Sequence, residues 1–350
     1  MKKNLINEYD LIESVIVHQP FDEMNHLTPK NLNSKDKENY LLFDDILYRK
    51  KAETEHKSFT DIIKVFTNKE NCFQLLSLLC EVMRDKGIRK DFLADIGYCG
   101  DIDYGITIDD PGILLTSILE GLNYQSLPLP NIMFTRDLAV SIGSSMIITW
   151  ASNKVRNPEN IIAKYIIKNH NLFSDCNIYD FHENHPDLAL EGGDVTLINK
   201  ETIAIGVSER TSRASVEAIT PFLYENGVKY IMCFDMPKER RFMHLDTVFS
   251  IINKNEAIVY HPFFEEGGPQ ELDVDIITAS KSSSLSTAKL KASSAFKEIG
   301  LDFNFIKCGG KYFQEQEQWT DGANAFCLYP GVIILYDRNI QTLQDLGKHG

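Results

Sequence analysis

Three segments that contain acidic residues recur at nearly even intervals along this chain. They hold Asp137 in Phe-Thr-Arg-Asp, Glu191 in Glu-Gly-Gly-Asp, and His244 with Asp246 in Met-His-Leu-Asp. Glu191 follows Asp137 by 54 residues, and His244 follows Glu191 by 53 residues. A period of this size is typical of a supersecondary unit that repeats around an axis. We therefore expect each copy to contribute polar side chains to a common centre.

Short apolar segments after Pro128-Leu129-Pro130 support such a repeat. Apolar and β-branched patterns predict strands at 146–150, 195–198, 203–207, 248–252, 257–260 and 332–336, with helices at 158–169, 213–226 and 287–299. The order strand, strand, helix, strand is typical of a propeller built from mixed units. Alternating residues at 11–18 predict an opening strand, and helical spacing over 40–122 predicts a helical insertion. The expected domains are 1–30 with 125–350, whose last repeat is incomplete, and the insertion at 31–124.

Composition narrows the class of protein. Of the 350 residues, 43% are hydrophobic and 25% are charged, which is enough to bury a sizeable core. The net charge of −14 disfavours nucleic acid and anionic membranes as partners and favours a cationic small molecule. There is no apolar run of about 18 residues and no secretion signal, so we expect a cytoplasmic protein. Seven cysteines without a Cys-x-x-Cys pair argue against a zinc site and a disulfide framework.

Carboxylates and an imidazole that converge would fit a planar cation with several N–H donors, and a guanidinium is the obvious candidate. If residues 243–249 form a strand, His244 and Asp246 point to the same face and share a cavity. Each segment also has a simpler interpretation: a strand end for the His-x-Asp pair, and a tight turn for the Gly-rich segment that begins at Glu191.

An aromatic ring, Phe134, precedes Asp137 by three residues, and stacking on an aromatic face suits a delocalised cation. Arg156 and Arg210 each follow one of the acids by 19 residues, counted from Asp137 and from Glu191. We expect these equal offsets to place both arginines on one rim, where they would hold the carboxylate of an amino acid. The alternatives are a core Phe and solvated surface arginines.

These segments, with others along the whole chain, resemble the bacterial-type arginine deiminases of the guanidine-modifying superfamily. The matching segments are His26-Leu27-Thr28-Pro29-Lys30-Asn31, Leu41-Leu42-Phe43-Asp44-Asp45-Ile46-Leu47, Pro128 to Asp137, Glu191-Gly192-Gly193-Asp194, Ile205 to Ser212, Met243 to Phe249, Cys308-Gly309-Gly310, Gln318 to Asn324 and Tyr336-Asp337-Arg338-Asn339. The resemblance implies an α/β fold, a five-bladed α/β propeller (pentein) with an inserted helical domain. It also implies hydrolysis of L-arginine to L-citrulline and ammonia without a metal or organic cofactor.

The resemblance implies roles for individual residues as well. It assigns guanidinium binding to Asp137, Glu191 and Asp246, proton transfer to His244, the α-carboxylate to Asn131, Arg156 and Arg210, and the aliphatic stem of the substrate to Phe134 and Leu42. In the family a cysteine thiolate attacks the guanidinium carbon and forms a thiouronium intermediate.

The nucleophilic cysteine of the family lies in a Gly-rich loop beyond Tyr-x-Arg-Asn, and this sequence ends at Gly350 before such a loop. Cys308 and Cys327 are poor replacements, so we expect the chain as given to bind arginine without hydrolysing it. An amidinotransferase and a non-catalytic arginine-binding protein are the alternatives. The oligomeric state, including a homo-oligomer, stays open.

Overall fold

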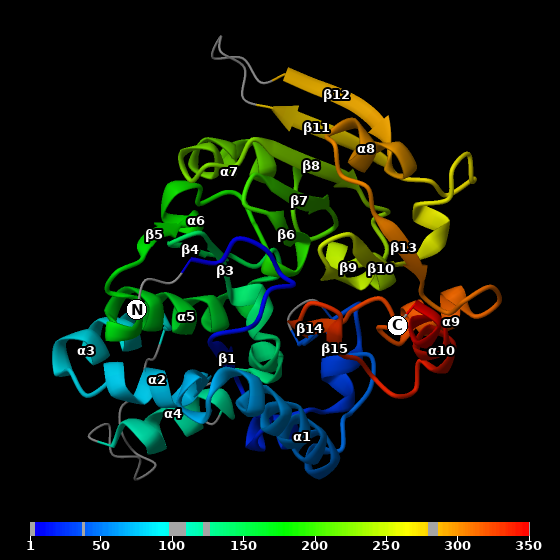
Figure 1. Ribbon diagram of the computed structural model, residues 1–350. Coiled ribbons are helices and arrows are strands. Elements are labelled where there is room, and N and C mark those ends of the chain that lie inside the picture. The colour runs from blue at the N-terminus through cyan, green and yellow to red at the C-terminus, as the bar shows by residue number, and fades with distance from the viewer. Residues whose placement is uncertain (1–3, 37–38, 98–109, 122–126, 279–285, 350) are drawn as a thin grey trace. The chain divides into compact units, whose positions relative to one another are not determined.

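The computed structural model describes residues 4–36, 39–97, 110–121, 127–278 and 286–349 (Figure 1). The chain packs as two compact units: unit 1 comprises Met1–Ile12, Val140–Ser152 and Phe181–Gly350, and unit 2 comprises Glu13–Ala139 and Asn153–Asp180. This division into units is not a test of the domain boundaries expected from the sequence. The assignment of a propeller domain and a helical domain at 31–124 stays a prediction.

Unit 1 contains most of the strands. Its elements, in chain order, are β3 (Ala139–Ile142), β4 (Ser145–Ile148), α6 (Phe181–Asn184), β6 (Val195–Asn199), β7 (Thr202–Val207), α7 (Arg213–Glu225), β8 (Tyr230–Asp235), β9 (Phe249–Asn253), β10 (Glu256–Val259), β11 (Asp273–Thr278), β12 (Ser286–Lys291), α8 (Ala292–Glu298), β13 (Asn304–Lys307), α9 (Gln314–Trp319), β14 (Phe326–Tyr329), β15 (Val332–Ile334) and α10 (Ile340–His349). The six predicted strands from 146 onward all correspond to observed strands.

The predicted repeat is visible in the strand pairing of unit 1. β6 pairs with β7 in an antiparallel hairpin, and β7 then pairs with β8 in parallel. In the next copy β9 and β10 form the antiparallel hairpin, and β10 pairs with β13 in parallel. Parallel neighbours need a crossover connection, which α7 provides in the first copy and the segment with α8 in the second. The order strand, strand, helix, strand is confirmed in the first copy; in the second copy β11 and β12 stand between β10 and α8 and join the first sheet. Closure of five such blades around an axis stays a prediction.

One predicted helix is partly wrong. Residues 287–299 begin as strand β12, which pairs antiparallel with β11, and only α8 is helical. The two strands extend the first sheet to the order β12-β11-β8-β7-β6. Lys291 and Lys289 reach Asp273 on β11, at 2.8 and 3.2 Å. Sheet pairing therefore overrides the helical propensity of this Ser- and Lys-rich segment.

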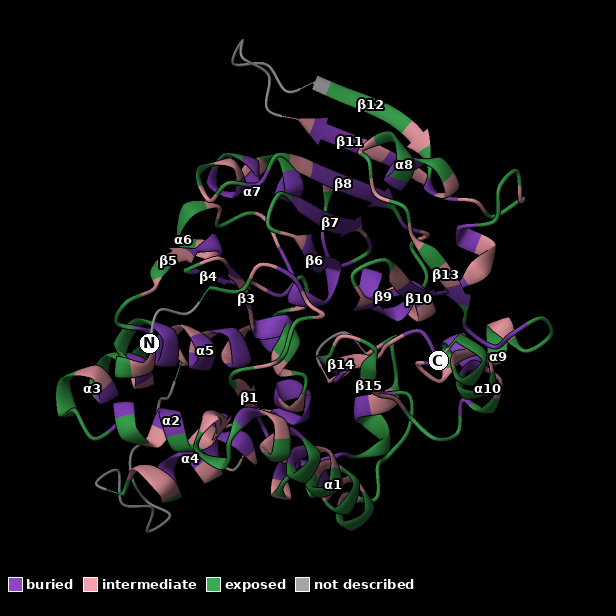
Figure 2. Cartoon of the chain, viewed as in Figure 1, coloured by how far each residue is buried: buried purple, intermediate pink, exposed green. Residues whose placement is uncertain are grey.

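Aromatic side chains fill the core of unit 1. Phe234 on β8, Phe249 on β9 and Phe296 on α8 are buried together, and the ring centroids of Phe249 and Phe296 lie 5.6 Å apart. Burial of each such ring stabilises the fold by about 1.5–3 kcal/mol. Figure 2 shows β7 and β8 as buried strands, consistent with a sheet that is covered on both faces. This core holds the strand ends from which the loops with Glu191 and His244 emerge.

Unit 2 is mostly helical. Its elements are β1 (Val15–Val17), α1 (Arg49–Thr67), β2 (Cys72–Gln74), α2 (Leu75–Val82), α3 (Lys86–Asp95), α4 (Pro111–Leu119), α5 (Asn157–Asn169) and β5 (Asn177–Asp180), with the short 3-10 helices η4 (Pro130–Met133) and η5 (Thr135–Leu138). The opening strand is shorter than predicted, and β1 pairs in parallel with β2. Asp85 and Asp110 cap α3 and α4 by accepting backbone N–H bonds, as N-cap residues do.

No helix in the described part of the chain is long and apolar enough to cross a membrane.

Candidate active site

Glu191 in unit 1 is fully buried, and its carboxylate is held at both oxygens. It directly follows Leu190, which forms an isolated antiparallel bridge with Trp150. Oε1 accepts hydrogen bonds from the backbone N–H of Ser152 at 2.9 Å and from the Ser152 hydroxyl at 3.1 Å. The Glu191 N–H donates to Thr211 Oγ1. These contacts leave Oε2 as the oxygen that faces the imidazole.

His244 Nε2 lies 2.9 Å from Glu191 Oε2, and both side chains are nearly fully buried. The same oxygen lies 3.4 Å from Nη1 of Arg210, so an imidazole and a guanidinium share it. We call Ser152, Glu191, Arg210 and His244 the His244 cluster. A buried carboxylate that holds one ring nitrogen fixes the orientation of the imidazole, which suits it for directed proton transfer.

The structure corrects the expected geometry of His244 and Asp246. Residues 245–247 form the 3-10 helix η10 (Leu245–Thr247), and β9 begins only at Phe249, so the alternation of a strand does not apply to the pair. Asp246 is nevertheless buried, with 8% of its surface exposed. The bend arises because the N–H of Leu245 bonds to the side chain of Asp194 instead of a strand neighbour.

Asp194, the last residue of η8 (Gly192–Asp194), lies under these loops and is completely buried. Its Oδ2 accepts the hydroxyl of Ser208 at 2.7 Å, and its Oδ1 accepts the N–H of Leu245 at 3.1 Å. Burial raises the pKa of Asp194 to about 7, although the nearby His244 charge and the hydroxyls of Ser208 and Thr211 lower it. Its charge state therefore changes near neutral pH.

A second group of polar side chains lies in unit 2. Arg156 Nη1 donates to Asp137 Oδ2 at 2.6 Å, and Arg156 Nε donates to Glu159 Oε2 at 2.9 Å. Arg156 Nη2 also donates to the backbone oxygen of Asn131 at 3.2 Å. Asp137, Arg156 and Glu159 are all buried. We call these four residues the Arg156 cluster, in which one guanidinium lies between two carboxylates.

The other predicted substrate-binding residues of unit 2 are Leu42 and Phe134. Contacts in this unit relate both of them to Asn131 or to its neighbours. Asn131 Nδ2 donates to the backbone oxygen of Leu41 at 2.8 Å, which ties η4 to the segment with Leu42. Leu42 has a φ of 63°, in the left-handed region that a side chain with a Cβ seldom adopts. Phe134 is 45% exposed, and its ring centroid lies 6.4 Å from that of Phe43. Backbone conformations of this strained kind concentrate at functional sites.

The equal offsets of the two arginines have a different meaning from the one expected. Neither arginine projects from an exposed rim, because Arg156 and Arg210 have only 3% of their surface exposed. Each contacts the acid 19 residues before it, Arg156 with Asp137 and Arg210 with Glu191. A second carboxylate, Glu209, lies 3.1 Å from Nε of Arg210, as Glu159 lies beside Arg156. The same ion pair, between an arginine and the acid 19 residues before it, thus occurs in both copies of the repeat. Contact of these arginines with a substrate carboxylate stays a prediction.

Sequence reasoning missed several members of these clusters. Glu159 follows Arg156 by three residues at the start of α5, a spacing that favours ion pairs on helices and could have signalled it. Arg240 is a neighbour of the His244 cluster and not a member: it lies in a basic pair shortly before His244, and its Nη1 lies 2.9 Å from Met243 Sδ, which also contacts Arg210. No local signal marks Ser152, since its partner is 39 residues away.

Among the described cysteines, those with buried thiols are unsuited to nucleophilic attack. Burial raises the pKa of Cys308 and of Cys233 to about 12, and it raises the pKa of Cys327 to about 11. A thiol with such a pKa carries almost no thiolate at neutral pH, and the thiolate is the reactive form. Cys99 lies outside the described residues.

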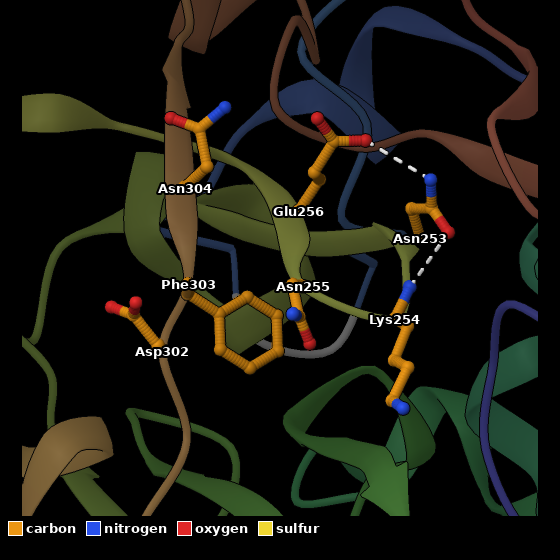
Figure 3. Close-up of a pocket in the computed structure, with 7 residues that line it drawn as sticks. All are labelled: Asn253, Lys254, Asn255, Glu256, Asp302, Phe303 and Asn304. Atoms are coloured by element: carbon orange, nitrogen blue, oxygen red, sulfur yellow. Dashed lines mark hydrogen bonds between the residues drawn. The ribbon is translucent and has the colours of Figure 1, made fainter.

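A polar depression at the tip of the β9–β10 hairpin, with a volume of about 650 Å³, does not coincide with either cluster. Figure 3 shows that Asn253, Glu256 and Phe303 are among its lining residues. Its amides and carboxylates bond to one another, as in the 3.1 Å contact from Asn253 Nδ2 to Glu256 Oε2. We therefore treat each cluster, within its own unit, as a candidate functional group of residues.

Comparisons with known proteins agree with this fold. The structure superposes on the DDAH of Pseudomonas aeruginosa, which was solved with citrulline, with a TM-score of 0.54, 14% identity and coverage of 97% of this chain and 90% of that chain. An amidinotransferase of Microseira wollei aligns with a TM-score of 0.52 and 12% identity over 99% of this chain and 89% of that chain. The fold is thus the α/β pentein fold.

The sequence comparisons are more specific. The family model for arginine deiminase matches residues 116–350. The chain is 32% identical to the arginine deiminase of Borrelia recurrentis, over 99% of this chain and 91% of that protein. It is 30% identical to the arginine deiminase of Listeria monocytogenes, over 98% of this chain and 90% of that protein. The chain belongs to the arginine deiminase family.

Proposed function

We propose that this chain binds L-arginine at the His244 and Arg156 clusters and that its chemistry is the hydrolysis of L-arginine to L-citrulline and ammonia. The 2.9 Å contact between His244 and Glu191, buried in a chain of the arginine deiminase family, is the observation that carries the proposal. Glu191 and Asp137 are the carboxylates for the substrate guanidinium, together with Asp246. That the two clusters serve one substrate stays the prediction drawn from the sequence.

The proposed chemistry proceeds in two stages through a thiouronium intermediate. A thiolate forms a C–S bond to the guanidinium carbon, the C–N bond to the departing nitrogen breaks, and His244 donates the proton that leaves with ammonia. Water then adds to the same carbon and gives a proton back to His244, and cleavage of the C–S bond releases citrulline and the thiolate. Glu191 keeps the imidazole oriented throughout because it holds Nε2.

The thiolate is the component that the buried cysteines do not supply, since Cys233, Cys308 and Cys327 are thiols with raised pKa values. We therefore propose that the 350-residue chain by itself binds arginine and releases no citrulline. Among the alternatives from the sequence, a non-catalytic arginine-binding protein is consistent with the same observation. An amidinotransferase has no specific support among the described residues.

Asn131, Arg156 and Arg210 are proposed to bind the α-carboxylate, with Phe134 and Leu42 beside the aliphatic stem. Because Arg156 is paired with Asp137 at 2.6 Å, an arriving guanidinium would compete with it for that carboxylate. Release of Arg156 would then leave its guanidinium available to the substrate carboxylate. The ligand would thus exchange one buried ion pair for two, which limits the desolvation cost of binding.

Isothermal titration of the purified chain with L-arginine tests the proposal, with L-norleucine as an analogue that lacks the guanidinium. We expect the chain to bind L-arginine and not L-norleucine. Glu191→Gln or Asp137→Asn should weaken the binding of arginine about 10- to 100-fold, because each variant loses a charge-assisted hydrogen bond. Asp187→Asn, at an exposed aspartate, is the matched control. Equal binding of norleucine contradicts guanidinium recognition, and citrulline release from the purified chain contradicts the absence of a usable thiolate.

A further inference from the structure

Asp194 connects three loops through one buried carboxylate. It ends η8, its Oδ2 accepts the hydroxyl of Ser208 in the loop after β7, and its Oδ1 accepts the N–H of Leu245 at the start of η10. The backbone N–H of Thr211 donates to the same Ser208 hydroxyl at 3.2 Å, which ties the end of this loop to the centre. These contacts join segments that are 14 and 51 residues apart in the sequence.

Each of these loops carries a member of the His244 cluster. Glu191 precedes Asp194 by three residues, and Arg210 lies between Ser208 and Thr211. His244 is the residue directly before Leu245. The Ser208 hydroxyl also accepts the N–H of Arg210 at 2.9 Å, so the loop with Arg210 is fixed to the same centre. The position of the carboxylate therefore determines how these side chains meet.

The sequence of β7 makes room for this arrangement. Gly206 lies inside a buried strand, where glycine loses packing and chain entropy. A Cβ added at Gly206 would lie 2.5 Å from Asp194 Oδ1 and 3.0 Å from Leu245 Cβ. A side chain at this position would displace the carboxylate or the start of η10. The glycine is thus explained by the close approach of Asp194 to the strand.

The charge of Asp194 also acts on the imidazole. The carboxylate and His244 interact electrostatically, and the positive charge of His244 favours the ionised form of Asp194. The reverse must hold as well, because linkage between two titrating groups is reciprocal. Glu191 acts on the same pair, since its charge disfavours ionisation of Asp194.

We propose that Asp194 is a positioning residue that holds His244 against Glu191 by clasping the Ser208–Thr211 loop and the N–H of Leu245. The functional consequence of this clasp, the orientation of His244 for proton transfer, rests on the proposed function. Asp194 itself contacts no substrate in this assignment.

Three variants test the clasp in the intact 350-residue chain. Asp194→Asn keeps an oxygen for Leu245 and removes the charge. Asp194→Ala removes the carboxylate, and Gly206→Ala displaces it from the opposite side. Asp187→Asn and Gly347→Ala are the matched controls, since one is exposed and the other has open space for a Cβ. The measurements are NMR spectra of histidine-labelled protein, with the His244 signal assigned by loss in His244→Gln, and titration with L-arginine.

In Asp194→Asn we expect the His244 ring to stay in the position that it has in the parent, and arginine affinity to stay within about threefold of the parent. The His244 imidazole should titrate at lower pH than in the parent. In Asp194→Ala and Gly206→Ala we expect the signals to move and the affinity to fall about tenfold or more. A chain that carries both substitutions should show no further loss, because both disturb the same contact. An unchanged His244 titration in Asp194→Asn overturns the charge effect. Unchanged ring signals in a folded Asp194→Ala or Gly206→Ala protein overturn the clasp.

The proposed function and the clasp by Asp194 can fail independently of each other. If the unsubstituted chain does not bind arginine, the proposed function fails, but the His244 signals still report whether Asp194 positions the ring. If arginine binds and the His244 signals ignore all three variants, the proposed function stands and the clasp is wrong. If Asp194→Ala and Gly206→Ala do not fold, the titration of His244 in Asp194→Asn decides the charge effect.

Discussion

The ion pair between Asp137 and Arg156 offers the most direct test of the Arg156 cluster, through the substitution Asp137→Asn. The pair has a 2.6 Å contact and side chains that are 11% and 4% exposed, for Asp137 and Arg156 respectively. At an effective dielectric constant of about 20, unit charges at this separation attract by about 6 kcal/mol. Desolvation of both groups offsets much of this energy.

Removal of one partner from a buried pair typically costs about 3–5 kcal/mol, because the other charge stays buried. Arg156 keeps Glu159 at 2.9 Å in the variant, so the expected loss is at the lower end, about 3 kcal/mol. A double-mutant cycle with Arg156→Met should give a coupling energy of about 2 kcal/mol. The loss should persist at high salt, since a buried pair is poorly screened.

The assay is equilibrium unfolding in urea for the parent, both single variants and the double variant, at low and at high ionic strength. The slope of free energy against urea should stay constant, which shows that only stability has changed. Asp61→Asn breaks an exposed pair with Lys57 on α1 of the same unit and should unfold like the parent. A coupling energy below about 0.5 kcal/mol would refute the reasoning, because it would mean that the two charges do not depend on one another.

Three further predictions address the substrate, the pH dependence and the backbone. Arg156→Lys should weaken L-arginine binding about tenfold in calorimetric titration and leave agmatine, which has no carboxylate, nearly unaffected; an equal loss for both ligands would exclude carboxylate recognition by Arg156. Burial raises the pKa of Asp194 to about 7 from 3.8, so the folded protein retains a proton that the unfolded chain loses. The Asp194 contribution to the free energy of unfolding should therefore be complete below about pH 4 and be lost as the pH rises through about 7, by up to about 4 kcal/mol. A plot of unfolding free energy against pH should be flatter for Asp194→Asn than for the parent over this range. Gly309 has a φ of 70° and lies against the backbone of Phe313, so Gly309→Ala should lower the melting temperature and cost about 2 kcal/mol or more, whereas Gly347→Ala should not; similar melting of both variants would count against the strain.

Much of the fold of unit 1 could be predicted from local patterns. The strands β6, β7, β9 and β10 are short apolar runs, two of which end at Asn, and their pairing follows from hairpins and crossovers of ordinary length. The exception, β12, shows why such predictions fail: its residues favour a helix locally, but hydrogen bonds to β11 and the two lysine contacts to Asp273 decide its conformation. Propensities of this size are small compared with the gain from completing a sheet edge.

The candidate site divides in the same way. The even spacing of the acids and the family segments are properties that the sequence by itself determined, because repeated supersecondary units place equivalent residues at equivalent loops. Only the tertiary structure decided that each arginine pairs with the acid of its own repeat, that His244 precedes a 3-10 turn, and that Asp194 lies beneath that turn against Gly206. Those outcomes depend on burial and on hydrogen bonds between segments up to 51 residues apart, and no local pattern encodes which partner a buried charge will find.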